Sequence, residues 1–169
     1  MVSLEVLVTG NNASTIYLFF EEMSRKYPTP EKYVLKNPEK YVGDIKNIIA
    51  RSSWEKKMMV WADTHPSVLK WNSEECIIPY VSPVDNKVHR YFVDFTVMIR
   101  DNSGNIRKYL VEVKPKAQTL PPKMRKKTKR YIEELQTYAV NQAKWEAASK
   151  VCEKSGYTFM VLTEEHLGL

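Results

Sequence analysis

Three consecutive stretches decide the fold of this chain: VHRYFVDFTVMI at residues 88–99, DNSGN at 101–105 and IRKYLVEVK at 106–114. The first and third are rich in β-branched and aromatic residues, and the second has the composition of a tight turn. Together they predict an antiparallel β-hairpin folded about Ser103 and Gly104. In that register Asp94 lies almost opposite Glu112, with Cβ atoms about 5 Å apart.

The two faces of this predicted hairpin differ in character. Lys114 shares a face with Glu112, because side chains two positions apart on a strand point the same way. The opposite face is apolar and would fix the register by its burial; it comprises Val93, Phe95, Val97, Ile99, Val111 and Val113. Paired carboxylates repel each other unless a cation or a shared proton lies between them. The pattern therefore predicts a divalent-metal site, and hard oxygen ligands favour Mg²⁺ or Mn²⁺ over zinc.

The composition predicts one soluble globular domain in the cytosol. A chain of 169 residues with 43% hydrophobic residues is large enough to bury a core. No apolar run approaches the roughly 20 residues that a membrane-spanning helix needs, and no secretory signal is recognisable. Cys76 and Cys152 lie far apart without metal-ligand spacing, so we expect reduced, partly buried thiols. Gly10 lacks the companions of a phosphate-binding glycine loop, so no nucleotide cofactor is expected.

The positive charge is concentrated in one segment. The net charge is +6, yet eight of the 26 basic residues lie between Lys114 and Arg130, where there is no acidic residue. The remainder of the chain holds 18 basic and 20 acidic residues. Because the segment directly follows the carboxylate strand, the basic surface and the metal site should be neighbours, as an enzyme acting on a polyphosphate backbone needs. The alternative is a solvated loop without a ligand, which Pro115, Pro121 and Pro122 would also suit.

The remaining elements follow from periodicity and turn residues. We expect a strand over residues 2–8, helices over 14–26, from 52 onward and over 131–153, and strands over 76–80 and 157–163. Residues 1–30 would form an N-terminal extension and 31–169 the main domain. The long helix should end at Gly156 and bury Ile132, Leu135, Ala139, Ala143, Ala147 and Val151. A long helix between two strands makes a parallel crossover, so a mixed sheet covered by helices is expected.

Glu55 has two interpretations. Trp54, Met58 and Trp61 have the spacing of a buried helical stripe, and Glu55 lies one position off it. With Ser52 it fits a capping box, in which its carboxylate satisfies the backbone at the start of the helix. Alternatively, it projects into the metal site as a third carboxylate. The spacing alone favours the cap.

The order of elements and the acidic residues resemble the PD-(D/E)XK nuclease superfamily. Asp94 on the second strand and Glu112, Val113 and Lys114 on the third match its motif, although Val93 stands where the family usually has proline. From about residue 36 onward, a longer signature resembles the head completion nucleases of contractile-tailed bacteriophages. It includes Tyr41, Gly43, Arg51, Glu55, Trp61, Trp71, Glu74, Tyr80, Tyr91, Pro115, Asn141 and Trp145. The same core is also similar to transposon-end endonucleases.

The resemblance implies a fold and a role for each matching residue. The fold would be an α/β restriction-endonuclease-like core in αβββαβ order. Asp94, Glu112 and the backbone carbonyl of Val113 would hold Mg²⁺ or Mn²⁺, and Lys114 would orient the attacking water. Glu55 would be a further acid at the metal rather than only a cap. The DNA backbone would be bound by Arg90, Lys116, Lys123, Arg125, Lys126, Lys127 and Lys144.

The implied function is a metal-dependent DNA endonuclease that acts in phage head completion after DNA packaging. DNA would be its substrate, phage portal or neck proteins its further partners, and the host cytoplasm or the virion its location. Two other functions compete with this one. The chain could be a structural neck protein that retains a nuclease fold without cutting, or a transposase subunit. The intact acid pair and lysine favour the enzyme.

Overall fold

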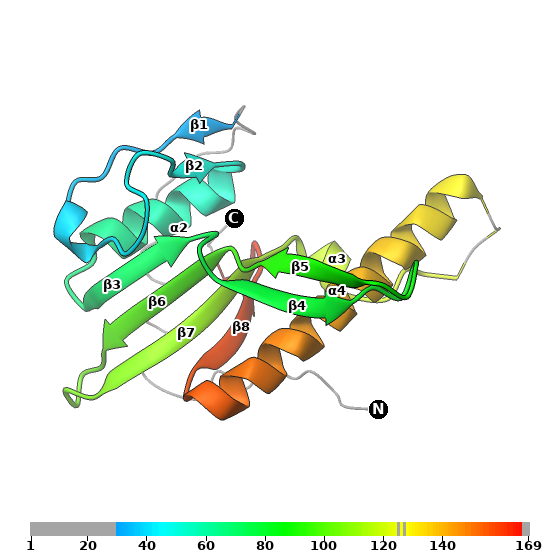
Figure 1. Ribbon diagram of the computed structural model, residues 1–169. Coiled ribbons are helices and arrows are strands. Elements are labelled where there is room, and N and C mark those ends of the chain that lie inside the picture. Colours follow the sequence, from blue (N-terminus) through cyan, green and yellow to red (C-terminus); the bar gives the residue numbers. More distant parts are fainter. Residues whose placement is uncertain (1–29, 125, 127, 167–169) are drawn as a thin grey trace.

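A four-stranded mixed sheet forms the centre of the structure, a computed structural model that describes residues 30–124, 126 and 128–166 (Figure 1). The strand order is β3-β6-β7-β8, with bounds Val68–Ser73, Phe95–Arg100, Ile106–Val113 and Thr158–Leu162. The first three strands are antiparallel neighbours, and β8 joins β7 in parallel. Helix α4 (Lys129–Ser155) connects those two parallel strands, which confirms the expected crossover and mixed sheet.

The hairpin of β6 and β7 has the predicted register. Phe95 pairs with Val111, and continuing that register by one residue sets Asp94 opposite Glu112. The turn is closed by Asp101, whose carboxylate accepts hydrogen bonds from the backbone N–H groups of Ser103 and Asn105 at 3.0 and 2.8 Å. Local turn chemistry therefore sets the register that brings the two acids together.

The stretch 88–99 is not one continuous strand, contrary to the prediction. Strand β5 (Val88–Phe92) pairs with β4 (Ile77–Val81) in a separate two-stranded ribbon, and β6 begins only at Phe95. At the corner between them, the Val93 N–H donates to the Cys76 carbonyl and the Asp94 carbonyl accepts from the Glu74 N–H. These bonds turn the chain, so Val93 packs in a different hydrophobic cluster from Phe95. The expectation that both share one face was wrong.

A strand that the sequence prediction missed forms one edge of the sheet. Strand β3 pairs with β6, and its register shifts between Val68 and Lys70. This bulge separates the buried residues Val68 and Trp71 by three positions rather than two, which hides the period of a strand. The predicted strand at 76–80 instead becomes β4 of the ribbon. The order αβββαβ still holds, with the ribbon inserted between its first two strands.

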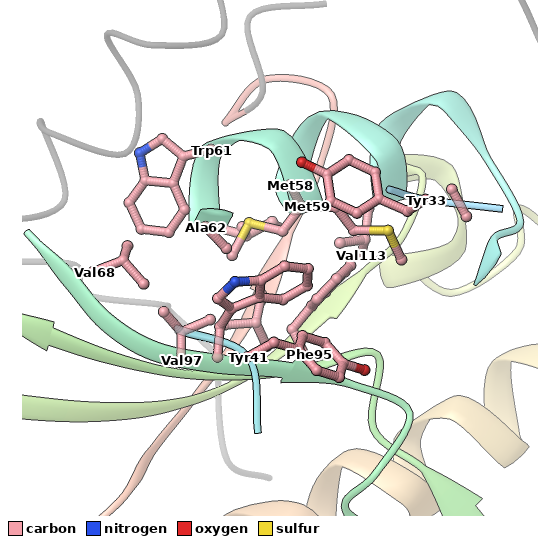
Figure 2. Packing of buried hydrophobic residues seen from close by; sticks show 14 of the residues in the cluster. Tyr33, Tyr41, Met58, Met59, Trp61, Ala62, Val68, Phe95, Val97 and Val113 are labelled. Carbon is pink, nitrogen blue, oxygen red and sulfur yellow. The ribbon is translucent and has the colours of Figure 1, made fainter. Parts of the chain in front are cut away.

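Helix α2 (Ser53–Thr64) covers one face of the sheet and forms the larger hydrophobic cluster with it (Figure 2). Met58 and Trp61 are fully buried there, and Trp54 packs against the cluster as a half-buried residue. This confirms the predicted helical stripe. From the sheet, Phe95 and Val113 meet the helix, which confirms the inward face of the hairpin.

Helix α4 packs on the other face of the sheet, and the ribbon packs against this helix (Figure 1). The buried residues of the helix are Tyr131, Asn141, Trp145, Ala148 and Cys152. Ile132, Leu135 and Val151 are exposed, so the predicted stripe was wrong at these positions, while Ala139, Ala143 and Ala147 are half-buried. The N-terminal part of the helix extends past the sheet, which explains the exposure of its apolar residues. The helix ends as predicted at Gly156, which has a left-handed φ of 70°.

Short elements complete the described chain: β1 (Glu31–Lys32), the 3₁₀ helix η2 (Pro38–Lys40), β2 (Ile49–Ala50) and α3 (Lys116–Thr119). Residues 33–37 are anchored by the buried Asp63 carboxylate, which accepts from the Tyr33 hydroxyl at 3.0 Å and from two backbone N–H groups. Cys76 and Cys152 are free thiols, as expected. Across the described ranges, no helix has both the length and the apolarity to cross a membrane. The elements predicted over 2–8 and 14–26 lie outside the described residues.

Candidate active site

Two carboxylates and a lysine meet where β7 ends beside the corner between β5 and β6. Asp94 is fixed by its Oδ2, which accepts a hydrogen bond from the Val113 N–H at 2.8 Å. Glu112 is only 2% exposed, and its Oε1 lies 3.1 Å from the Lys114 Nζ. The structure therefore brings together the three side chains that the sequence placed on neighbouring strands.

The surroundings of this group make ionisation of Asp94 unfavourable. The pKa of Asp94 is raised from 3.8 to about 8, mainly by burial and the neighbouring Glu112 carboxylate and to a smaller extent by the charge of Glu55. These effects outweigh the lowering effects of Lys114 and the Val113 N–H. The pKa of Lys114 is raised on balance, because attraction to Glu112 and Asp94 outweighs the lowering effect of burial. One lysine does not fully compensate the buried Glu112 carboxylate and the half-buried Asp94 carboxylate, so the site favours an additional cation.

Tyr91 completes the surroundings of Glu112. Its hydroxyl donates to the Glu112 Oε2 at 2.6 Å, and the tyrosine is itself 2% exposed. Burial, followed by the charge of Glu112, raises the pKa of Tyr91, so the phenol keeps its proton. The sequence prediction gave Tyr91 no role beyond its place in the longer signature. In one straight strand, Tyr91 and Asp94 would point to opposite faces. The corner at Val93 and Asp94 removes that restriction.

Glu55 takes the capping role that its spacing indicated. Its backbone N–H donates to the Ser52 Oγ, and its carboxylate accepts from the Ser52 Oγ and the Arg51 N–H at 3.1 and 2.9 Å. Its charge still reaches the acid pair, since it contributes to the raised pKa of Asp94. Within residues 30–124, 126 and 128–166, no three Asp, Glu, His or Cys side chains are grouped to hold one ion. A direct role for Glu55 at a metal stays a prediction.

Arg51 and Glu74 form an ion pair at the edge of the site, which the sequence prediction also missed. The guanidinium donates to both Glu74 carboxylate oxygens, each at 2.8 Å. Glu74 has a positive φ of 58°, and its N–H bonds the Asp94 carbonyl. Arg51 precedes α2 and Glu74 follows β3. Because Glu74 bonds the Asp94 backbone, the ion pair helps to fix the position of Asp94 relative to these two elements. Both residues belong to the longer signature, which was the only sequence signal for them.

The basic residues of the loop after β7 are exposed where the structure describes them. Lys123 and Lys126 are exposed, whereas Arg125 and Lys127 lie outside the described residues. Lys116 is exposed on α3, and its amine pairs with Glu165 while its N–H donates to the Glu164 carboxylate at 2.7 Å. Lys123 and Lys126 are thus accessible to a polyanion, and Lys116 already has an acidic partner.

Arg90 and Lys144 lie on the side of the ribbon. The Arg90 guanidinium is exposed and lies 5.5 Å from the centre of the Phe92 ring. The Lys144 amine, on α4, lies 5.7 Å from the Tyr80 ring and 5.4 Å from the Tyr91 ring. Arg90 can reach a ligand directly, whereas Lys144 is half-buried and engaged with two aromatic faces.

The donor set of the site fits a hard divalent cation. Asp94 and Glu112 supply carboxylate oxygens, and the Val113 carbonyl is the oxygen donor between Glu112 and Lys114 in the chain. Mg²⁺ and Mn²⁺ prefer such oxygen ligands and keep several waters when bound by one or two carboxylates. A cation would also relieve the repulsion that raises the pKa of Asp94.

Comparison with known proteins agrees with this geometry. A family model described as TnsA-like endonuclease N terminal matches residues 65–164, more than half of the chain. The chain belongs to the TnsA-like endonuclease family. The head completion nuclease of Enterobacteria phage T4 is 42% identical to it over 141 residues, which are 80% of this chain and 91% of that protein. No solved structure matches the chain.

The region matched by the endonuclease family contains the three central residues but not the whole predicted site. Asp94, Glu112 and Lys114 lie within residues 65–164, as does Tyr91. Glu55 and Arg51 precede the matched region. The family match and the phage T4 relative confirm the resemblance inferred from the sequence. The roles of the individual residues stay predictions.

Proposed function

We propose that the chain is a Mg²⁺- or Mn²⁺-dependent DNA endonuclease that works in phage head completion after DNA packaging. The observation that carries this proposal is the meeting of Asp94, Glu112 and Lys114 in a group that has more negative than positive charge. The phage T4 relative is a head completion nuclease, which supports the role in head completion. The host cytoplasm would be the place of action, and phage portal or neck proteins would be partners besides DNA.

Asp94, Glu112 and the Val113 carbonyl would hold the metal. When bound there, it would lower the pKa of a water molecule and polarise the scissile phosphate. Lys114 stays protonated, because Glu112 and Asp94 raise its pKa against the effect of burial. Its role is therefore that of a cation and hydrogen-bond donor, which orients the attacking water and neutralises charge on the phosphate, rather than that of a general base.

The exposed basic residues would hold DNA by its backbone. Lys123 and Lys126 follow the catalytic strand along the chain and are exposed, as is Arg90 on the ribbon. Lysine amines neutralise phosphates without reading bases, so we propose binding with little sequence specificity and strong dependence on salt. Lys144 would contribute mainly through its contact with Tyr91.

A cleavage assay with a matched pair of variants tests the proposal. Purified protein is incubated with supercoiled and with linear DNA in Mg²⁺, Mn²⁺ or EDTA, and DNA binding is measured in parallel. Glu112→Gln keeps an oxygen acceptor of the same shape but removes the charge, so cleavage should fall by at least a hundredfold while binding is kept. Asp101→Asn removes one charge at the opposite end of the same hairpin and should cleave normally.

The assay also separates the enzyme from the structural alternative. If the unaltered protein binds DNA but cleaves neither substrate with any divalent metal, the non-catalytic neck protein becomes the better description. If Glu112→Gln cleaves as fast as the unaltered protein, the site is elsewhere. Cleavage in EDTA at the same rate would refute the dependence on a metal.

A further inference from the structure

We propose that Tyr91 is a positioning residue that fixes the Glu112 carboxylate for metal binding. The inference rests on the proposed function and deepens it, because it assigns a residue that the PD-(D/E)XK motif does not contain. Its evidence is the hydrogen bond of 2.6 Å from the Tyr91 hydroxyl to the Glu112 Oε2, between two side chains that are each 2% exposed.

The hydrogen bond crosses between two separate sheets. Tyr91 belongs to β5 of the ribbon, whereas Glu112 belongs to β7 of the main sheet. Three residues after Tyr91, the same chain supplies Asp94, whose carboxylate is held by the Val113 N–H next to Glu112. The two carboxylates are thus positioned by reciprocal bonds: the ribbon donates to Glu112 on the sheet, and β7 of the sheet donates to Asp94 in the corner. Moving the ribbon would displace both acids together.

The two oxygens of Glu112 have different partners. Tyr91 occupies Oε2, and Oε1 is contacted by the Lys114 amine at 3.1 Å. The Tyr91 hydroxyl sits on a ring that is fixed by its packing and holds Oε2 in place, whereas the Lys114 amine on its flexible stem is displaced more easily. We infer that Oε1 is the Glu112 oxygen that would be available to a metal, with the Lys114 amine beside it to contact the water and the phosphate.

Lys144 supports the tyrosine from the helix side. Its amine lies 5.4 Å from the centre of the Tyr91 ring and 5.7 Å from that of Tyr80, so one cation faces two aromatic rings. Tyr91 packs in the cluster that includes Ile78, Val93 and Ala148, which leaves its ring little room to rotate. The hydroxyl is therefore presented to Glu112 by a rigid surrounding, as positioning of a metal ligand requires.

Tyr91→Phe tests the proposal, because it removes the hydroxyl and keeps the ring. The probe is Mn²⁺ alone, titrated into the full-length protein by calorimetry without DNA. Loss of a partner that orients a metal ligand lowers metal affinity 10- to 100-fold, so we expect a rise in the Kd for Mn²⁺ in that range. Near-ultraviolet circular dichroism and thermal unfolding verify that the variant is folded.

Tyr80→Phe is the matched control. Tyr80 lies on the other strand of the ribbon and faces the same Lys144, but the hydroxyl that reaches Glu112 is that of Tyr91. This variant should keep the Kd for Mn²⁺ within about twofold. In the cleavage assay, Tyr91→Phe should lower kcat and raise the Mg²⁺ concentration for half-maximal rate without changing the KM for DNA. Excess Mn²⁺ should restore part of its activity.

The outcomes separate this inference from the proposed function. If the unaltered protein binds Mn²⁺ and cleaves DNA while Tyr91→Phe has the same Kd and the same kcat, the positioning role is refuted and the enzyme stands. A loss of thermal stability with unchanged metal affinity would likewise assign Tyr91 a structural role only. If the unaltered protein neither binds Mn²⁺ nor cleaves, both proposals fall together.

Discussion

Replacing Asp94 by asparagine should stabilise the metal-free protein while abolishing cleavage. Burial and the charge of Glu112 raise the pKa of Asp94 in the folded chain to about 8, from 3.8 for an unperturbed carboxyl. Ionised Asp94 is therefore better tolerated in the unfolded chain than in the folded one. Asparagine resembles the protonated acid, and its Oδ1 can still accept the hydrogen bond from the Val113 N–H.

The sign and size of the effect follow from the two pKa values. Below about pH 4 the carboxyl is protonated in both states, so it costs no stability there. The cost grows between pH 4 and pH 8 and is constant above, up to about 6 kcal/mol if the raised pKa of about 8 applied to a fully enclosed group. Asp94 is partly exposed, so screening reduces the cost, and we expect Asp94→Asn to gain about 1–3 kcal/mol at pH 8.

Urea unfolding in EDTA at pH 5 and pH 8 measures this difference. The gain of Asp94→Asn at pH 5 should be less than a third of that at pH 8. Asp101→Asn is a control of opposite sign, because hydrogen bonds from Asn105, Arg107 and Ser103 outweigh burial and lower the pKa of Asp101. Excess Mg²⁺ should then stabilise the unaltered protein, by about 2.7 kcal/mol at 100 times the Kd, and leave Asp94→Asn unchanged.

Two results would refute this reasoning. If Asp94→Asn is less stable than the unaltered protein at pH 8 in EDTA, the ionised carboxylate is stabilising and the site does not lack a cation. If the difference in stability is the same at pH 5 and pH 8, it does not arise from ionisation of Asp94. Either result would remove the electrostatic argument for a metal, whatever the cleavage assay shows.

Three further variants test other parts of the molecule. Glu55→Gln keeps the capping acceptor, so we expect unchanged stability in urea. The variant also removes the negative charge that Glu55 would contribute at the metal, so we expect cleavage to be at least tenfold slower. Changing both Lys123 and Lys126 to glutamine should reduce the slope of log affinity against log salt by about 2, measured by filter binding, with kcat unchanged. Trp71→Ala should lower the free energy of unfolding by about 3–5 kcal/mol, because this side chain is 1% exposed in the core.

The register between β6 and β7 was predictable because the features that set it are local in sequence. The turn at residues 101–105 and the apolar face formed by Phe95, Val97 and Ile99 specify the pairing of β6 with β7. From that pairing alone, Asp94 and Glu112 are neighbours. The capping box at Ser52 and Glu55 is local in the same sense, and the spacing identified it.

The features that could not be predicted depend on distant parts of the chain. The exposure of Ile132 and Leu135 follows from how far α4 extends beyond the sheet, which the period of the helix does not encode. The period of β3 is interrupted by a bulge beside Lys70. The bond between Tyr91 and Glu112 depends on where the ribbon departs from the sheet.

Val93 stands where the motif has proline, and this difference affects the geometry of the site. The PD-(D/E)XK motif that the sequence resembles has proline at this position, but here the Val93 N–H donates to the Cys76 carbonyl at 2.9 Å and the side chain is fully buried. Proline has no N–H, so it would break the bond between the ribbon and the corner. That bond holds β5 in the position from which Tyr91 reaches Glu112. Valine at 93 is therefore consistent with a site in which the hydrogen bond to the ribbon, rather than a rigid proline, sets the backbone direction just before Asp94.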